Sequence, residues 1–152
     1  MSKTLPIRTT PARSASMKRV RRQGTDIEIR VRKLLTGIGA RYRLNVRDLP
    51  GSPDIANKRR KKAIFVHGCF WHFHSACPRG RVPTRNRDFW QEKLLANRTR
   101  DAEKIKSLRA ITYDVMVIWE CELVDEELIR KKIEMFWFGD CAVILFLQRF
   151  GH

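Results

Sequence analysis

The stretch IFVHGCFWHFHSAC, residues 64–77, contains three of the four histidines and two of the four cysteines in the 152-residue chain. Neutral imidazole and thiolate are preferred ligands of zinc, and imidazole is also the usual general base near neutral pH. The apolar start of the stretch is typical of a short buried strand, whereas Gly68, Pro78 and Pro83 keep the following chain irregular. This stretch therefore predicts a buried strand that runs directly into a loop with a metal site and a catalytic group.

Basic residues dominate the composition, with 32 lysines and arginines against 16 acidic residues and a formal net charge of +16. They recur in separate runs at 18–22, 58–62 and 79–87. Such runs favour a polyanionic partner. Nucleic acid is preferred over a membrane because the runs fall in predicted loops, not on one face of an amphipathic helix. We therefore expect a nucleic-acid-binding protein with no membrane partner.

The expected cellular compartment decides whether the cysteines are interpreted as disulfides or as metal ligands and free thiols. No apolar run is long enough to span a bilayer, and the first residues lack the apolar core of a secretory signal. We therefore expect a cytoplasmic protein, in which cysteines bind metal or stay as free thiols. Cys69, Cys77 and Cys121 are available to a site, whereas Cys141 begins an apolar stretch and is interpreted as a core thiol.

The order of elements predicts the fold class. Residues 1–23 are basic and contain no acid, which predicts a flexible N-terminal arm before a single domain at 24–152. Helices are predicted at about 25–38, 87–110 and 125–138, the first capped by Thr25 with Glu28 and the last by Asp125. Strands are predicted at 40–46, 54–56, 63–66, 114–120 and 141–147, with a basic hairpin tip at 58–62. This order predicts an α/β layered domain with a mixed sheet.

Cys69, His74 and Cys77 offer three metal ligands from one loop with the spacing C-x4-H-x2-C, and Cys121 follows a predicted strand. Three thiolates and one imidazole complete a tetrahedral zinc shell, which is typical of structural zinc. Such an ion would stabilise a loop that has few apolar residues. The spacing leaves open whether His72 replaces His74 as a ligand, and unrelated thiols beside a surface histidine remain an alternative.

Candidates for catalysis are less clearly separated by the sequence. Asp54 begins one predicted strand, and a second strand ends beside it at Val66 and His67, an arrangement that can hold Mg²⁺ against a phosphate. An aspartate after proline is also common in turns. Glu28 is explained by helix capping but borders the apolar stripe of its helix. His67 and His72 are suited to catalysis, to metal binding or to ordinary hydrogen bonding.

Phe70 and Trp71 are consecutive large aromatic residues in the loop that follows Gly68. Adjacent side chains cannot both point into one core. Packing over the metal loop and insertion between DNA bases explain them equally well.

Five ordered segments carry a resemblance to a known family: MKRVRRQGTDIE, RYRLNVRDLPGSPDIA, IFVHGCFWHFHSAC, FWQEKLLANRTRD and VMVIWECEL. Together they resemble the very-short-patch-repair DNA mismatch endonuclease family from about Met17 to Leu123. The resemblance implies a restriction-endonuclease-like three-layer domain, with a central mixed β-sheet flanked by helices and a structural zinc site. It also implies an enzyme that nicks one strand beside the T of a T:G mismatch, by Mg²⁺-dependent phosphodiester hydrolysis. Such mismatches arise when 5-methylcytosine deaminates, and the nick initiates very short patch repair.

The resemblance also assigns roles to residues of this chain. Asp54 matches the catalytic metal-binding aspartate, and Val66 the position whose main-chain carbonyl is a further Mg²⁺ ligand. His72 matches the general acid/base, with His67 and Glu28 as supporting catalytic residues. The resemblance further implies structural zinc ligands at Cys69, His74, Cys77 and Cys121, and DNA-inserting side chains at Phe70, Trp71 and Met17.

Two alternative functions stay open. The first is a related nuclease with a different DNA target, of the homing or mobile-element type. The second is a zinc-stabilised DNA-binding module without catalysis, against which Asp54, His67 and His72 argue. The lysine that usually accompanies a nuclease aspartate is absent from the strand at 63–66, which argues against an ordinary restriction enzyme. We expect a monomer in the bacterial cytoplasm, associated with the nucleoid, with mismatch-repair proteins as candidate partners.

Overall fold

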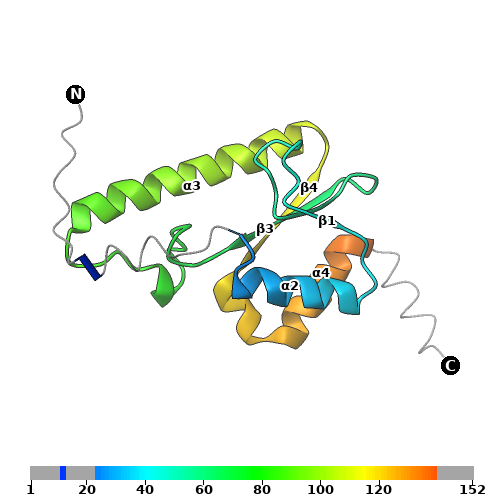
Figure 1. The fold of residues 1–152 in the computed structure, drawn as a ribbon, viewed down its shortest axis with the longest axis horizontal. Coiled ribbons are helices and arrows are strands. Elements are labelled where there is room, and N and C mark those ends of the chain that lie inside the picture. The colour runs from blue at the N-terminus through cyan, green and yellow to red at the C-terminus, as the bar shows by residue number, and fades with distance from the viewer. Residues whose placement is uncertain (1–10, 13–22, 140–152) are drawn as a thin grey trace.

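A computed structural model describes residues 11–12 and 23–139 (Figure 1). Met17, most of the predicted arm at 1–23, Cys141 and the predicted strand at 141–147 lie outside the described residues. The element order is α2 (Asp26–Gly37), β1 (Arg43–Leu44), β2 (Ile55–Asn57), β3 (Lys62–His67), a 3₁₀ turn (Pro78–Gly80), α3 (Arg87–Ala110), β4 (Asp114–Trp119), a second 3₁₀ turn (Glu120–Val124) and α4 (Glu126–Phe138).

The strands form one mixed sheet in the order β1-β2-β3-β4. β1 pairs antiparallel with β2, β2 pairs antiparallel with β3, and β3 pairs parallel with β4. The parallel pair ends with His67 opposite Trp119. β3 is therefore the central strand that its apolar sequence predicts, and the basic run at 58–62 forms the tip of the β2–β3 hairpin as expected.

The first strand is shorter than predicted. The alternation at 40–46 predicts a half-buried strand, but only Arg43 and Leu44 pair in the sheet, and Leu44 is 40% exposed. Asn45 has a left-handed φ of 48°, which interrupts the extended backbone, while its N–H still donates to the carbonyl of Asp54 at 2.8 Å. The chain then turns, and Val46 is buried beneath α3 instead.

Helices cover both faces of the sheet, with α3 on one face and α2 with α4 on the other (Figure 1). The larger core cluster joins these two helices to the sheet through Val31, Leu35, Ile55, Ile64, Val66, Met116, Ile118, Ile129, Ile133 and Trp137. On the α3 side the core consists of Val46, Ala56, Ala63, Phe65, Leu108 and Tyr113. Side chains along β3 thus alternate between the two faces, as a fully buried strand requires. The architecture is α/β with a mixed sheet, as predicted.

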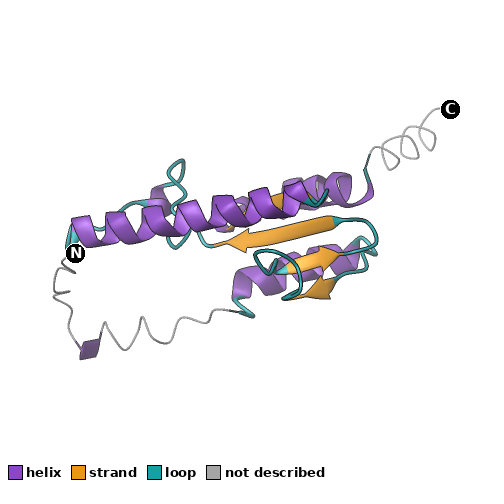
Figure 2. Cartoon of the chain, turned by 90° about the horizontal axis from the view of Figure 1, so that it is seen from above, coloured by secondary structure: helices purple, strands orange, loops and turns teal. Residues whose placement is uncertain are grey.

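The helix signals in the sequence correspond closely to the observed helices. Thr25 caps α2 by accepting a hydrogen bond from the N–H of Glu28, and Asp125 caps α4 by accepting one from Leu128 at 3.0 Å. Helix α3 has the predicted bounds, and its N-terminal half extends beyond the strands (Figure 2). Among the described residues, no helix combines the length and apolar character needed to cross a membrane.

Candidate active site and metal cluster

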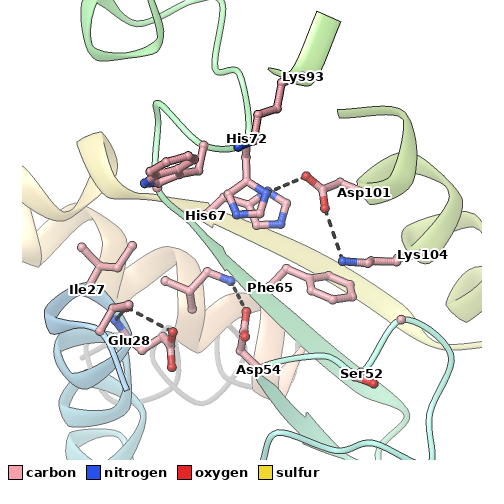
Figure 3. A pocket seen from close by; sticks show the side chains of 15 residues that line it. Ile27, Glu28, Ser52, Asp54, Phe65, His67, His72, Lys93, Asp101 and Lys104 are labelled. Atoms are coloured by element: carbon pink, nitrogen blue, oxygen red, sulfur yellow. Dashed lines mark hydrogen bonds and ion pairs between the residues drawn. The ribbon is translucent and has the colours of Figure 1, made fainter. Parts of the chain in front are cut away.

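A pocket of about 570 Å³ opens where the C-terminal end of β3 meets the start of α2, the loop before β2, and α3 (Figure 3). All four catalytic residues predicted from the sequence line this pocket, although the first and the last of them are 44 positions apart in the chain. The polar and charged residues that line it are Thr25, Glu28, Ser52, Asp54, His67, His72, Lys93, Asp101 and Lys104.

Asp54 lies directly before β2 and faces the end of β3. Its Oδ2 accepts a hydrogen bond from the N–H of Val66 at 2.8 Å, which fixes the carboxylate beside that peptide. Burial raises the pKa of Asp54 to about 6, the hydrogen bond from Val66 opposes this rise, and the negative charge of Glu28 adds to it. Burial makes the ionised form of Asp54 costly, and a nearby cation would stabilise that form. The position of Asp54 therefore suits a hard divalent ion.

Glu28 both caps its helix and points inward, so the two interpretations of the sequence are compatible. Its carboxylate accepts hydrogen bonds from the Gly24 N–H at 2.8 Å and the Thr25 hydroxyl at 3.1 Å. The residue is only 6% exposed and lines the same pocket as Asp54. Two carboxylates therefore face one cavity, which supplies the oxygen ligands or water-ordering groups that Mg²⁺ prefers.

His67 and His72 stack in parallel, with ring centroids 3.8 Å apart and planes 4° apart. His67 is 4% exposed, and burial followed by the charge of His72 lowers its pKa to about 3. His67 is therefore neutral near pH 7. His72 lies nearer the surface, and its Nδ1 is 2.6 Å from Oδ2 of Asp101.

Asp101 is the functional candidate that the sequence interpretation missed. It lies on α3, is 8% exposed, and contacts His72 across 29 positions of sequence. Burial acts to raise the pKa of Asp101, but the hydrogen bond and charge of His72 outweigh it and the pKa is lowered overall. An ionised Asp101 accepts a hydrogen bond from Nδ1–H of His72, which leaves Nε2 as the basic nitrogen of that ring.

A sequence signal for Asp101 does exist. The buried positions Leu94, Asp101 and Leu108 recur at every seventh residue of α3, so they lie on one face of the helix. An acid in the apolar stripe of a helix is rare unless it has a partner. An acidic residue among these apolar positions therefore indicates that Asp101 has a buried polar partner. The pattern does not identify that partner as His72.

Cys69, His74, Cys77 and Cys121 form a second cluster, in which the candidate ligand atoms all lie within 4.8 Å of one another. Nδ1 of His74 is 3.6 Å from Sγ of Cys69 and 3.4 Å from Sγ of Cys121. Ligand lengths of about 2.3 Å to sulfur and 2.0 Å to nitrogen place S and N about 3.5 Å apart around a tetrahedral zinc ion. The residues therefore fit a common metal. His72 belongs to the Asp101 contact, not to this cluster.

The loop around this cluster is held by close backbone packing. The carbonyl of Cys69 accepts from the His74 N–H at 2.9 Å, and the carbonyl of His74 accepts from the Cys77 N–H at 3.1 Å. A β-carbon at Gly80 would lie 2.2 Å from the His74 carbonyl oxygen, so only glycine fits there. The His74 ring also stacks on Trp119, with centroids 4.1 Å apart.

Phe70 and Trp71 pack against α3. Their rings meet edge to face at 5.1 Å, and Trp90 of α3 contacts Phe70 at 5.4 Å and Trp71 at 6.1 Å. Trp90 is buried, whereas the other two rings are partly exposed, and Trp71 lines the pocket. Lys93 lies over the Trp71 and Trp90 rings at 5.9 and 5.4 Å. An aromatic and cationic rim thus borders the pocket, a combination suited to nucleic-acid bases.

Comparison with known proteins identifies relatives of this chain. The family described as DNA mismatch endonuclease Vsr matches residues 7–78. The chain is 48% identical to type II nicking enzyme V.XorIIP of Xanthomonas oryzae pv. oryzae, over 72% of this chain and 79% of that one. It is 41% identical to type II nicking enzyme V.NmeAIP of Neisseria meningitidis, over 82% and 89% of the two chains. It is 36% identical to DNA mismatch endonuclease Vsr of Escherichia coli, over 86% of each. The chain belongs to the DNA mismatch endonuclease Vsr family.

Proposed function

We propose that this protein is a Mg²⁺-dependent DNA endonuclease with a restriction-endonuclease-like fold, which nicks one strand beside the T of a T:G mismatch. The substrate would arise by deamination of 5-methylcytosine, and the nick would begin very short patch repair. The observation that carries this proposal is the hydrogen bond between His72 and Asp101, in the pocket that also holds Asp54. A general base and a site for a divalent cation meet there beside a basic and aromatic surface.

Asp54 is the proposed direct ligand of Mg²⁺, with the main-chain carbonyl of Val66 as a second ligand and Glu28 ordering the surrounding water. When bound, the ion would neutralise charge on the phosphate and make a water molecule more acidic. The raised pKa of Asp54 supports this assignment, because burial beside Glu28 makes an added positive charge favourable.

His72 is the proposed general base. As the water oxygen forms a bond to phosphorus, Nε2 of His72 takes the water's proton, and the bond from phosphorus to one deoxyribose oxygen breaks. The departing oxygen takes a proton from solvent. Asp101 keeps the His72 ring oriented and stabilises the imidazolium that forms. His67 stays neutral against the other face of the ring, so it does not oppose this charge.

The cysteine and histidine cluster is the proposed structural zinc site. Three thiolates and one imidazole leave no open position, so the ion would hold the loop between β3 and α3 without taking part in the chemistry. The loop in turn carries His72, Phe70 and Trp71. Removal of zinc is therefore expected to disturb the catalytic and DNA-binding residues together.

Phe70 and Trp71 are the proposed wedge at the mismatch, with Met17 as a further DNA contact. A T:G wobble pair stacks less well than a matched pair, so inserting side chains there costs less energy. Deformability would then contribute to specificity. The name of the Escherichia coli relative, DNA mismatch endonuclease Vsr, supports a mismatched substrate. We further propose that the protein acts as a monomer in the bacterial nucleoid, with mismatch-repair proteins as partners.

The test compares duplexes that differ only in a T:G or T:A pair, incubated with the protein and Mg²⁺. Nicking of the T:G duplex alone, beside the T, supports the proposal. Equal nicking of both duplexes would favour a nuclease with another target, and tight binding without nicking would favour a DNA-binding module. Asp54→Ala and His72→Ala are expected to abolish nicking while DNA binding and folding survive. A panel of T:G sites in varied flanking sequences then defines the context that is required.

A further inference from the structure

A lysine from α3 enters the candidate active site. The end of β3 contributes Phe65, Val66 and His67 beside Asp54, so that strand supplies no cation to the pocket. Lys104 lines the same pocket from the opposite wall, and its ammonium points toward the cavity (Figure 3). Lys93, the other lysine among the lining residues, lies at the aromatic rim over Trp71.

The stem of Lys104 is fixed by the loop that carries Asp54. Gly51 adopts a left-handed φ of 74°, and a β-carbon there would lie 2.6 Å from Cβ of Lys104 and 2.7 Å from its Cγ. The loop therefore rests directly on the aliphatic stem, and a side chain at position 51 would displace one or the other. This contact fixes the first carbons of the stem, and 43% of the side chain stays exposed.

The surroundings of Lys104 leave it able to bind an anion. Nζ lies 3.6 Å from Oδ1 of Asp101, while Oδ2 of Asp101 contacts His72. One loose ion pair does not use the three N–H donors of an ammonium group. The positive charge of Lys104 acts on Asp54, His67 and Asp101, where it is the smallest of the causes that act to lower the pKa.

A phosphodiester in this pocket meets several acidic groups. Glu28, Asp54 and Asp101 all face it, and each repels a phosphate oxygen unless a cation intervenes. A bound divalent ion would offset the charge near Asp54 and Glu28, at one side of the cavity. Lys104 lies on the α3 side, next to Asp101 and His72. A phosphate held between the two sides would therefore be contacted by the metal on one side and by Lys104 on the other.

We propose that Lys104 is a catalytic residue, whose ammonium binds a non-bridging oxygen of the scissile phosphate and stabilises the charge that develops there. This inference rests on the proposed function. In this role Lys104 transfers no proton, since His72 takes the proton of the attacking water. A fixed cation acts most strongly where negative charge grows in the transition state, so its effect falls mainly on kcat.

The first experiment measures kcat and KM for Lys104→Met and Lys104→Arg on the T:G duplex with Mg²⁺. The matched control is Lys106→Met, which removes the same charge from an exposed position about 200° around the helix. We expect Lys104→Met to lose about 10²-fold in kcat, the usual effect of removing one such charge-stabilising group. Lys104→Arg should recover at least part of that loss. A kcat within about threefold of wild type for Lys104→Met, or an equal loss for Lys106→Met, would overturn the proposal.

The second experiment separates contact with the phosphate from an indirect effect through Asp101. Lys104→Met is combined with Asp101→Asn. If Lys104 only positions Asp101, the double variant has the activity of Asp101→Asn alone, and the proposal fails. If Lys104 contacts the phosphate, the two losses multiply, because each group then acts separately in the transition state.

The third experiment needs no nicking. Binding is measured without Mg²⁺ for a T:G duplex with either a normal phosphate or a neutral methylphosphonate at the proposed cleavage position. The neutral group removes the repulsion by the carboxylates in every protein, but it removes the contact with Lys104 only where Lys104 is present. The ratio of affinities for the normal and the neutral duplex should therefore be about tenfold or more higher in wild type and Lys106→Met than in Lys104→Met, as expected for a charge-assisted hydrogen bond. An equal ratio in all three proteins would refute the contact. A wild-type protein that nicks no T:G duplex would instead refute the proposed function, which this binding comparison does not depend on.

Discussion

His67 and His72 lie face to face with ring centroids 3.8 Å apart, yet within the described part of the chain only His72 is hydrogen-bonded to a carboxylate. Two stacked imidazoles cannot both carry a positive charge without repulsion. Burial keeps the proton off His67, whereas Nδ1 of His72 lies 2.6 Å from Oδ2 of Asp101. The pair therefore divides into a neutral ring and a ring that a carboxylate orients, although the two side chains are chemically identical.

Stability should depend on pH through His67. Its pKa is lowered to about 3 from the ordinary 6.5, so between these values the unfolded chain binds a proton that the folded protein does not. The free energy of unfolding therefore decreases as the pH falls below about 6.5. Relative to His67→Gln, wild type should lose up to about 1.4 kcal/mol per pH unit in this range. Urea denaturation at a series of pH values, without Mg²⁺, measures the difference.

Comparing wild type with His67→Gln removes the contribution of Asp54 to the pH dependence of the free energy of unfolding. Burial raises the pKa of Asp54 from 3.8 to about 6, so this group makes the free energy of unfolding decrease as the pH rises through that range. Both proteins contain Asp54, and its contribution cancels in their difference. If the difference in free energy of unfolding between the two proteins does not change with pH, His67 does not lose its proton on folding.

Asp101→Asn should impair catalysis without impairing DNA binding. An amide donates as well as accepts, so it no longer selects the His72 ring with the proton on Nδ1, and it does not stabilise the imidazolium. We expect kcat on the T:G duplex to fall by about 10²- to 10⁴-fold with little change in binding affinity. Glu103→Gln, an exposed neutralisation on the same helix, is the control and should retain activity. Equal losses for both variants would mean that net charge, not the contact with His72, is responsible.

Cys121→Ser should lower zinc content and thermal stability together. Cys121 follows β4, while the other three candidate ligands lie in the loop after β3, so the ion would cross-link two segments that follow neighbouring strands. Structural zinc binding is coupled to folding, and loss of one thiolate weakens both. Metal analysis and thermal unfolding test this expectation. Cys141→Ser is the control and should keep a full equivalent of zinc, whereas an unchanged zinc content in Cys121→Ser would contradict the cluster.

Gly80→Ala should destabilise the metal loop although it adds a single methyl group. The new β-carbon would lie 2.2 Å from the carbonyl oxygen of His74, and a backbone atom cannot swing aside. We expect the melting temperature to fall by several degrees and zinc affinity to fall with it, in line with the about 1–3 kcal/mol cost of overpacking. The control is Gly37→Ala in α2, where a β-carbon meets no atom within 4 Å, and stability should be unchanged or higher. Similar melting temperatures for both variants would contradict the close packing.

The sequence predicts those parts of the fold that depend on residues close to one another along the chain. The caps at Thr25 and Asp125 and the apolar spacing of α3 are local signals, and the helices have the expected bounds. The strand at 40–46 was predicted too long because the left-handed Asn45 is not visible in an alternation of side chains. Spacing also left His72 and His74 interchangeable. Phe73 between them has a φ of 51°, and this local turn directs the two rings to different sites.

The candidate site depends more on long-range contacts. His72 and Asp101 meet only because α3 crosses the end of β3, and no local pattern links two residues that are 29 positions apart. Lys104 was missed for the same reason, since an isolated lysine on a long basic helix has no distinguishing signal. The resemblance to a family assigned roles to residues in recognised motifs, and the fold adds the partners that those residues require.

The parallel pairing of β3 with β4, which ends with His67 opposite Trp119, has a consequence for errors in folding. A slip of one residue would turn His67 to the other face of the sheet and would also move Cys69 away from Cys121. Register errors would thus disrupt the candidate metal site and the candidate catalytic pocket in a single step. The alignment of one strand pair therefore decides whether both candidate sites can form.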